Sequence, residues 1–227
     1  RVDDGRGNTN SCTATVTVVD TTAPALSLTP PAGASADAGC SALVPAVADA
    51  VQDNCDASPV VTQSPPAGAS VGEGVTTLTV VAKDASGNAT TNTTAFTVSD
   101  TTAPSANVPA NIVTTNDAGL CSAVVTFSLP AQSDNCGVAG QVATPASGSA
   151  FNVGLNLVTV VVTDVHGNSA TNTFTVTVND VELPVIAVPA NIVQGVDVGQ
   201  NYATVTFTNT ATDNCDPNPS VVATPAS

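Results

Sequence analysis

Hydrophobic and hydroxyl-bearing residues alternate along much of the chain. Residues Thr173–Val178 read Thr-Phe-Thr-Val-Thr-Val, which is the two-residue period of a strand with one buried and one exposed face. Such segments are short, and they are separated by Pro, Gly, Asp and Asn, the residues that favour turns. No segment shows a helical period of useful length. The pattern therefore predicts an all-β protein.

The same pattern predicts seven strands within residues 100–179. We expect them at roughly 105–108, 111–115, 122–129, 139–145, 150–153, 156–164 and 170–179. Seven short strands with turn signals between them are typical of an immunoglobulin-like β-sandwich. The chain has no Trp, so the Cys…Trp…Cys signature of antibody domains is absent.

Several motifs recur along the chain in one order, at a spacing of about 80 residues. Asp-Thr-Thr-Ala-Pro stands at 20–24 and 100–104, and a looser form stands at 180–184. Asp-x-x-Gly-Asn stands at 4–8, 84–88 and 164–168, and Asp-Asn-Cys at 53–55, 134–136 and 213–215. Val-Pro-Ala-Asn-Ile stands at 108–112 and 188–192. The chain is therefore expected to consist of tandem repeats.

The repeats predict the domain boundaries. We expect the C-terminal part of a preceding repeat at 1–19, repeats at 20–99 and 100–179, and the N-terminal part of a further repeat at 180–227. Because both ends fall inside a repeat, we expect a window on a longer array or one unit of a polymer. Strand donation between head-to-tail chains would leave the strand that matches 148–160 missing, so we favour a continuous chain.

These motifs, together with Asp-Ala-Gly-(Leu)-Cys and the final Thr-Phe-Thr-Val-Thr-Val, resemble the hyalin repeat, or HYR domain. The resemblance covers essentially the whole chain. It implies tandem immunoglobulin-like β-sandwich repeats in a linear rod, with an extracellular adhesive or structural role, as in repeat proteins of bacterial surfaces. The sequence departs from the family where Cys often precedes Pro-Ala-Asn-Ile, because Val108 and Val188 stand there.

Charge and composition exclude several classes of partner. The net charge is −15, and the only basic residues are Arg1, Arg6 and Lys83, so nucleic acid and anionic membrane surfaces are not expected to bind. No run of about 20 apolar residues indicates membrane insertion within this segment. Aromatic residues make up only 3% of the chain, which favours several small valine-lined cores over one large core.

Six cysteines, with no Cys-x-x-Cys and one His, favour disulfides over a zinc site. Disulfides in turn imply an oxidising compartment, and we expect the protein outside the cell or on its surface. Pairing within repeats would give Cys40–Cys55 and Cys121–Cys136. Pairing between neighbouring repeats would give Cys40–Cys136 and Cys121–Cys215.

The expected strands favour the second pairing without excluding the first. Residues 122–129 would span about 25 Å as a strand, whereas a disulfide requires Cα atoms within about 7 Å. Cys121 would open this strand and Cys136 would lie beyond its far end. The third repeat has Asn201 where Cys40 and Cys121 fall in theirs, so only pairing between repeats gives Cys215 a partner.

Acidic and amide residues are expected to converge at one pole of each sandwich, from the linker and from two loops. Oxygen ligands of this kind suit Ca²⁺, a hard cation, although Asp, Gly and Asn are also what tight turns demand. Both interpretations remain open here. The candidate ligands are Asp100, Asp134, Asn135, Asp164 and Asn168, with Asp20, Asp53, Asn54 and Asp84 as their equivalents.

Sugar is a further expected component. Asn88 and Asn92 lie in Asn-x-Thr sequons, on and just after a predicted hairpin loop, and O-linked glycans on Thr or Ser are also possible. Charged residues make up only 9% of the chain, so glycans could supply the solvation. A Thr-rich β surface without sugar would give the same composition.

The chain is not expected to be an enzyme. Gly-x-Ser-x-Gly, a P-loop and His-Glu-x-x-His are absent, and the only histidine, His166, is expected as a solvated turn residue. We expect a structural segment of an extracellular fibre or cell-surface stalk, whose partners are further copies of the repeat, end to end. An adhesin-type module that binds a carbohydrate or protein is the alternative, and a spacer for an enzyme encoded elsewhere is a third.

Overall fold

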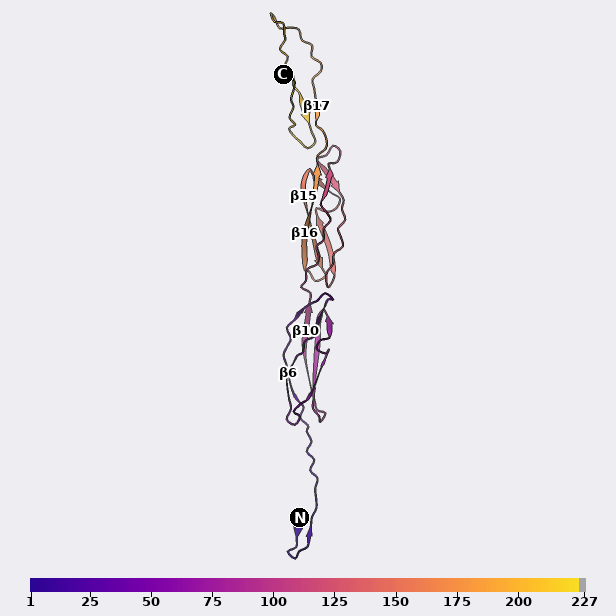
Figure 1. Cartoon of the computed structure of the whole chain (residues 1–227), viewed down its shortest axis with the longest axis vertical. Helices are drawn as coiled ribbons and strands as arrows, with labels where there is room; N and C mark the ends of the chain where they lie inside the picture. Colours follow the sequence, from indigo (N-terminus) through magenta and orange to yellow (C-terminus); the bar gives the residue numbers. More distant parts are fainter. Residues whose placement is uncertain (225–227) are drawn as a thin grey trace. The chain divides into compact units, whose positions relative to one another are not determined.

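The computed structural model describes residues 1–224 and contains strands but no helix within them (Figure 1). The all-β prediction is therefore confirmed. The chain divides into two compact units, Arg1–Thr101 and the part from Thr102 onward. Because the described residues include no helix, none of them forms an apolar helix long enough to cross a membrane.

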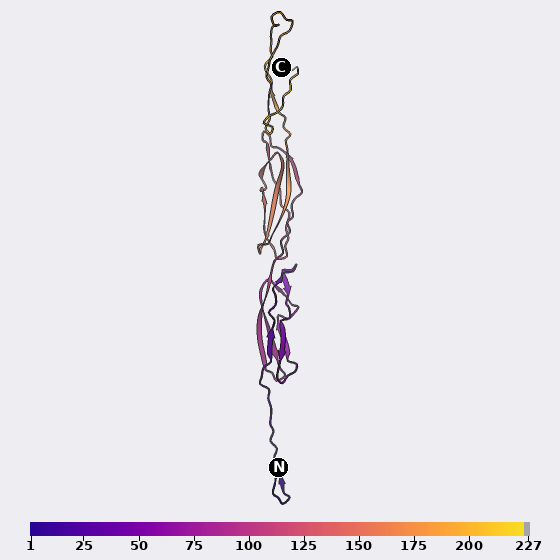
Figure 2. The same ribbon diagram turned by 90° about the vertical axis from the view of Figure 1, so that its left-hand side faces the viewer.

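The first twenty residues make one small hairpin and a connecting segment. β1 (Val2–Asp3) pairs with β2 (Thr9–Asn10) around the first Asp-x-x-Gly-Asn loop. Residues 11–19 carry no regular secondary structure and form a lone trace in both views (Figures 1 and 2). The sequence predicted this stretch as the tail of an earlier repeat.

The rest of the first unit consists of one four-stranded sheet and two strand pairs. In the sheet, the two-residue strand β4 runs parallel to β10, and the other neighbours are antiparallel. Its order is β4 (Ala34–Ser35), β10 (Ala89–Ser99), β9 (Gly74–Lys83) and β7 (Val60–Ser64). The antiparallel pairs are β3 (Ala25–Leu28) with β6 (Ala48–Gln52), and β5 (Ser41–Leu43) with β8 (Ser70–Gly72).

The second unit repeats this order. Its four-stranded sheet is β11 (Ile112–Thr115), β16 (Ser169–Asn179), β15 (Gly154–Asp164) and β13 (Val138–Thr144). β11 runs parallel to β16, as β4 does to β10. The strand pairs are β12 (Ser122–Val125) with β14 (Ser149–Asn152), and β17 (Val185–Ala187) with β18 (Thr210–Thr212).

Each unit has its own apolar core. In the first, the buried residues are Ala36, Ala42, Val44, Val47, Leu78, Val80, Ala82, Phe96 and Val98. In the second, they are Ala123, Val125, Phe151, Val158, Val160, Val162, Phe174, Val176 and Val178. The alternation in the long strands explains this, because every second residue of β15 and β16 faces the same side of the sheet.

The predicted strand at 105–108 is wrong, because side chains replace its ladder. Asn107 donates its N–H to Gln132 Oε1 at 2.7 Å, and Gln132 Nε2 donates to the Asn107 carbonyl at 2.9 Å. A glutamine side chain thus makes both hydrogen bonds that a neighbouring strand would make. One bond between backbone groups joins this segment to the residues next to Gln132: the Ser105 N–H donates to the Ser133 carbonyl at 2.8 Å.

The strand predicted at 122–129 ends early, at Val125. Beyond it, Ser147 Oγ accepts from the Phe127 N–H at 2.8 Å and donates to the Phe127 carbonyl at 2.7 Å. One hydroxyl therefore satisfies both backbone groups of Phe127 without a ladder. The observed strand β12 is half as long as the strand from which the pairing between repeats was predicted.

The segment from residue 180 to 224 has strand pairing but no core of its own. None of its described residues is buried. Its apolar side chains are largely exposed, among them Val185 on β17 and Val193. In the two complete repeats the long hairpins β9–β10 and β15–β16 supply most of the buried valines, and residues 180–224 include no such hairpin.

Candidate functional site

The Asp-x-x-Gly-Asn motif forms the loop of each long hairpin, and its aspartate is buried. Asp84 is 5% exposed and Asp164 is 2% exposed. Asp84 accepts from the N–H and from Nδ2 of Asn88, both at 2.8 Å. Gly87 has a φ of 97°, a conformation that glycine adopts without a steric penalty. The turn chemistry expected from the motif is therefore present.

These hydrogen bonds keep the buried carboxyl ionised. Burial disfavours the charged form of Asp84 and is the largest single influence on its pKa. The side chain of Asn88 and the backbone N–H groups of Asn88, Gly87 and Ser86 act in the opposite direction. Together they outweigh burial and lower the pKa of Asp84 below its ordinary value.

Three of the predicted metal ligands come together at one pole of the first unit. One carboxylate oxygen from each of Asp20, Asp53 and Asp84 lies within 4.8 Å of the other two. Asp20 precedes β3, Asp53 follows β6 and Asp84 follows β9. Two further bonds hold these loops together: Asn88 Nδ2 donates to the Asp20 carbonyl at 3.3 Å, and the Ala85 N–H donates to Asp56 Oδ2 at 3.0 Å.

Two oxygens of this carboxylate cluster have no hydrogen-bond partner. Oδ1 of Asp20 accepts from the Thr22 N–H at 3.0 Å, and Oδ1 of Asp53 accepts from the N–H groups of Cys55 and Asp56. Oδ2 of Asp20 and Oδ2 of Asp53 are both buried and accept nothing from the described residues. Such atoms are uncommon, because a buried carboxylate oxygen is costly without a partner.

The remaining predicted ligands lie in different local settings. Asp134 matches Asp53, since its Oδ2 accepts from the N–H groups of Cys136 and Gly137 while its Oδ1 is buried and accepts nothing from residues 1–224. Asn168 turns its Nδ2 toward Asp164 at 2.8 Å. Asn54 is exposed. The grouping predicted for Asp100, Asp134, Asn135, Asp164 and Asn168 stays a prediction.

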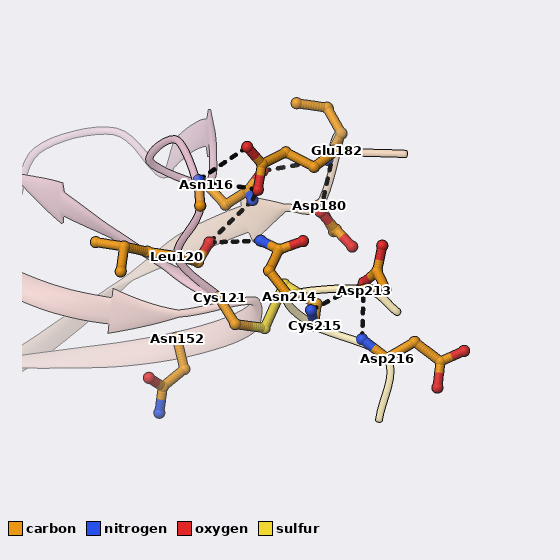
Figure 3. The surroundings of a disulfide bond; sticks show 12 residues. Asn116, Leu120, Cys121, Asn152, Asp180, Glu182, Asp213, Asn214, Cys215 and Asp216 are labelled. Carbon is orange, nitrogen blue, oxygen red and sulfur yellow. Dashed lines mark hydrogen bonds between the residues drawn. A yellow bond between two sulfur atoms is a disulfide. The ribbon is translucent and has the colours of Figure 1, made fainter. Parts of the chain in front are cut away.

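A disulfide joins Cys121, just before β12, to Cys215, and the two Cα atoms are 4.9 Å apart (Figure 3). The alternative Cys121–Cys136 bond is therefore not formed. Cys55 is a free thiol, as is Cys12, so the alternative Cys40–Cys55 bond is not formed either. The Cys40–Cys136 pair stays a prediction.

Glu182 anchors the linker after β16 to the turn between β11 and β12 (Figure 3). The Gly119 N–H donates to both of its carboxylate oxygens, at 2.8 and 3.0 Å. Asn116 Nδ2 donates to Glu182 Oε2 at 3.4 Å, and its Oδ1 accepts from the Val181 N–H at 3.2 Å. Asn116 is 8% exposed, so its two bonds are partly shielded from solvent, whereas the Gly119 bonds are exposed.

Asn214 makes a second contact beside the disulfide. Its Nδ2 donates to the Leu120 carbonyl at 2.9 Å, and Asn116 Nδ2 donates to the same oxygen (Figure 3). Asp213 orders the loop by accepting from the N–H groups of Cys215 and Asp216. In this copy of Asp-Asn-Cys the asparagine therefore bridges two segments. That role differs from the ligand role predicted for Asn54 and Asn135.

Sequence reasoning missed Asn116 and Glu182, although the sequence holds a signal for both. Each departs from the repeat, since Ala36 and Thr102 stand at the corresponding positions of the preceding repeat boundary. The two departures lie on the two sides of one junction and bond to each other. Two positions that both differ from the preceding repeat, one on each side of a junction, would therefore have indicated the contact.

The predicted glycosylation sites are less exposed than a hairpin tip suggests. Asn88 and Asn92 are both half-buried. The Nδ2 atom of Asn92 donates to the Leu26 carbonyl at 2.7 Å, and that of Asn88 donates to Asp84 and Asp20. Glycosylation at either site stays a prediction. His166 is exposed in the β15–β16 loop, as expected.

The second unit matches a known family. The model of the HYR domain family matches residues 99–178. These residues form an HYR domain. The resemblance indicated by the motifs is thereby confirmed for this part of the chain. The HYR domain comprises strands β11 to β16 and the core around Phe151 and Phe174, and the Cys121–Cys215 bond connects it to the segment that follows.

Two curated relatives share the sequence pattern over a longer stretch. The chain is 40% identical over 147 residues to a hyalin of Lytechinus variegatus, an alignment that covers 60% of this chain and 27% of that protein. It is 39% identical over 145 residues to a hyalin of Strongylocentrotus purpuratus, with 60% and 12% covered. The alignments thus span about a quarter or less of these relatives.

Solved structures give a weaker likeness. The crystal structure of Drosophila N-cadherin EC1-4 superposes with a TM-score of 0.39 at 14% identity, and the match covers 71% of this chain and 50% of that one. This similarity is too low to bear on the function of the chain.

Proposed function

We propose that this chain is a structural, non-enzymatic segment of an extracellular fibre or cell-surface stalk built from HYR domains in tandem. The observation that supports this most directly is the Cys121–Cys215 bond. It makes a covalent connection between an HYR domain and the segment that follows it. A bond placed between successive segments resists their separation, as a structural segment requires.

The contacts beside the disulfide favour the same role. Glu182, Asn116 and Asn214 tie the following segment to the turn before β12 by hydrogen bonds of 2.8–3.4 Å. A hydrogen bond to a charged carboxylate is stronger than one between neutral groups. In this proposal the carboxylate contact restrains the junction, and the disulfide prevents it from opening.

Disulfide chemistry and the relatives both support the extracellular location that we propose. Disulfides persist in oxidising surroundings and are rare in the cytosol. The HYR match and the hyalin relatives support an adhesion-type protein outside the cell without catalytic activity. Further copies of the repeat are the partners we propose, and N-linked or O-linked sugar belongs to the proposal as a surface coat.

The adhesin alternative has less support. Protein surfaces that bind sugars or other proteins often use exposed aromatic rings. Of the six aromatic residues in the chain, only Tyr202 is exposed, at 58%. The open hollow beside Glu182 and Asp213 is lined by acidic, amide, hydroxyl and aliphatic residues and by no aromatic ring of residues 1–224, so it offers no ring on which a sugar could stack.

Electron microscopy of the native material tests the proposal. Gold-labelled antibodies against this chain should decorate filaments or stalks along their length. Labelling restricted to the cell interior, or to compact particles without extended structure, would contradict it. Binding of the purified chain to a glycan or protein array, without decorated filaments, would favour the adhesin alternative.

A further inference from the structure

We propose that Asp20, Asp53 and Asp84 bind a calcium ion at one pole of the first sandwich. The three carboxylates come from three separate elements: the linker before β3, the loop after β6 and the end of β9. The proposal concerns this cluster alone and does not depend on the structural role of the whole chain.

The spacing of the oxygens fits one calcium ion. Ca²⁺ binds oxygen ligands at about 2.3–2.6 Å, so two ligands on opposite sides of an ion are about 5 Å apart. One oxygen from each carboxylate lies within 4.8 Å of the other two. A single ion can therefore contact all three carboxylates, with water or backbone carbonyls completing its coordination.

The hydrogen bonds of the cluster leave oxygens available for an ion. The backbone donors that order the two loops all reach Oδ1 of Asp20 and Oδ1 of Asp53. Oδ2 of each residue is buried and has no partner among the described residues. A buried anionic oxygen without a donor is unfavourable, and a cation is the partner that satisfies both oxygens together.

The ligand set selects the kind of ion. All three side chains are carboxylates, which suit hard cations, whereas zinc and copper sites typically include histidine or cysteine. Magnesium requires nearly ideal octahedral geometry and gives up its water reluctantly, while calcium accepts irregular sites with several ligands. Three carboxylates from loops of different elements fit calcium best, with a dissociation constant of about 10⁻⁴–10⁻³ M, as in extracellular modules.

The chain supplies a matched control in the β1–β2 hairpin. Asp4 accepts from Asn8 Nδ2, the Asn8 N–H and the Arg6 N–H, which is the bonding that Asp84 has within its own hairpin. Asp4 is exposed and belongs to none of the carboxylate groups found within residues 1–224. The variant Asp4→Asn thus changes the same turn chemistry outside the cluster.

Hydrogen exchange of the intact, oxidised chain, with and without millimolar calcium, tests the site locally. We expect calcium to slow exchange in residues 53–56 and 84–88 of the wild type and of Asp4→Asn. The isosteric variants Asp53→Asn and Asp20→Asn keep the oxygen that accepts the loop hydrogen bonds, so they should fold and lose the effect. Calorimetric titration with calcium chloride should show affinity at this site at least tenfold weaker in both.

Two results would overturn the proposal. One is unchanged exchange in both loops of the wild type with calcium present. The other is a calcium effect that persists in Asp53→Asn and in Asp20→Asn, because the ion would then bind elsewhere. Magnesium at the same concentration serves as the ionic-strength control and should slow exchange much less.

Discussion

A single aspartate organises each long hairpin of this chain. Asp164 accepts from the His166 N–H, the Asn168 N–H and Asn168 Nδ2, each at 2.8 Å. Because Asp164 is 2% exposed, water cannot take over these bonds. The motif alone indicates a turn, since Asp, Gly and Asn are common turn residues. Burial of the carboxylate could not be read from it, because the same motif at residues 4–8 is exposed.

The variant Asp164→Ala should destabilise the HYR domain. It removes a buried acceptor and leaves its donors, two N–H groups and one carboxamide, without partners, which is costly in a buried site. We expect faster hydrogen exchange along β15 and β16 and a lower urea midpoint. Asp4→Ala removes the same set of bonds from an exposed turn, so it should leave hydrogen exchange along β15 and β16 unchanged. Equal effects of the two variants would show that burial is irrelevant.

The carboxyl of Asp164 also makes stability depend on pH. Burial raises its pKa and is the largest single influence, but the donors of Asn168, His166 and Gly167 together lower it below the ordinary 3.8. A carboxyl whose pKa is lower in the folded than in the unfolded chain stabilises the fold at any pH above its pKa in the unfolded chain. This stabilisation is lost as the pH falls through the pKa of the folded chain. Urea unfolding from neutral pH to about pH 2 should show wild-type stability falling below about pH 4. Asp164→Ala should show a shallower fall, and parallel curves would contradict this.

Long and short strands differ in how far the sequence predicts them. The expected strands at 156–164 and 170–179 agree within two residues with β15 and β16. Their alternation extends over about ten residues, and Phe174, Val176 and Val178 are all buried on one face. The strand expected at 105–108 is absent because Gln132, 25 residues away from Asn107, makes its bonds. A local pattern contains no information about such a distant side chain.

Phe174 gives the element-scale prediction. It lies on β16, is 2% exposed, and its ring meets that of Phe127 edge-on with centroids 5.0 Å apart. Phe174→Ala should lower the free energy of unfolding of the HYR domain by about 3–5 kcal/mol, because it leaves a cavity in a small core. Leu155→Ala on the neighbouring strand β15, at a residue 74% exposed, should change it by less than about 0.5 kcal/mol. Chemical denaturation followed by circular dichroism measures both, and similar losses would contradict the assignment of the core.

At the scale of the chain, the repeat predicts more than local patterns do. Repetition predicted a bond between two different loops of successive repeats, the loop of Cys121 in one repeat and the Asp-Asn-Cys loop of Cys215 in the next, and this bond is present. It also grouped Asp20, Asp53 and Asp84, which the structure brings together. Asn116 and Glu182 were missed because repeat reasoning looks for what recurs. They form their contact where the sequence does not recur.

The Cys121–Cys215 bond should limit how far the chain can be extended by force. Cys121 and Cys215 are 94 residues apart in sequence, and an unfolded chain extends by roughly 3.5 Å per residue. The bond therefore withholds about 330 Å of contour length from a molecule pulled at its ends. In single-molecule pulling, the fully unfolded Cys121→Ser variant should be longer than the wild type by this amount. The control Cys55→Ser changes a free thiol and should leave the length unchanged.

The same measurement decides the predicted Cys40–Cys136 pair. If that bond is also present, the shortest covalent path through the unfolded wild type passes from Cys40 to Cys136 through one disulfide. It then follows the 15 residues back to Cys121 and passes through the second disulfide to Cys215. The variant instead extends the 79 residues between positions 136 and 215, a net gain of 64 residues, or about 220 Å at the same rise per residue. A gain near 330 Å would therefore exclude Cys40–Cys136. No gain at all would contradict the bond at Cys121, and with it the covalent connection on which the proposed structural role depends.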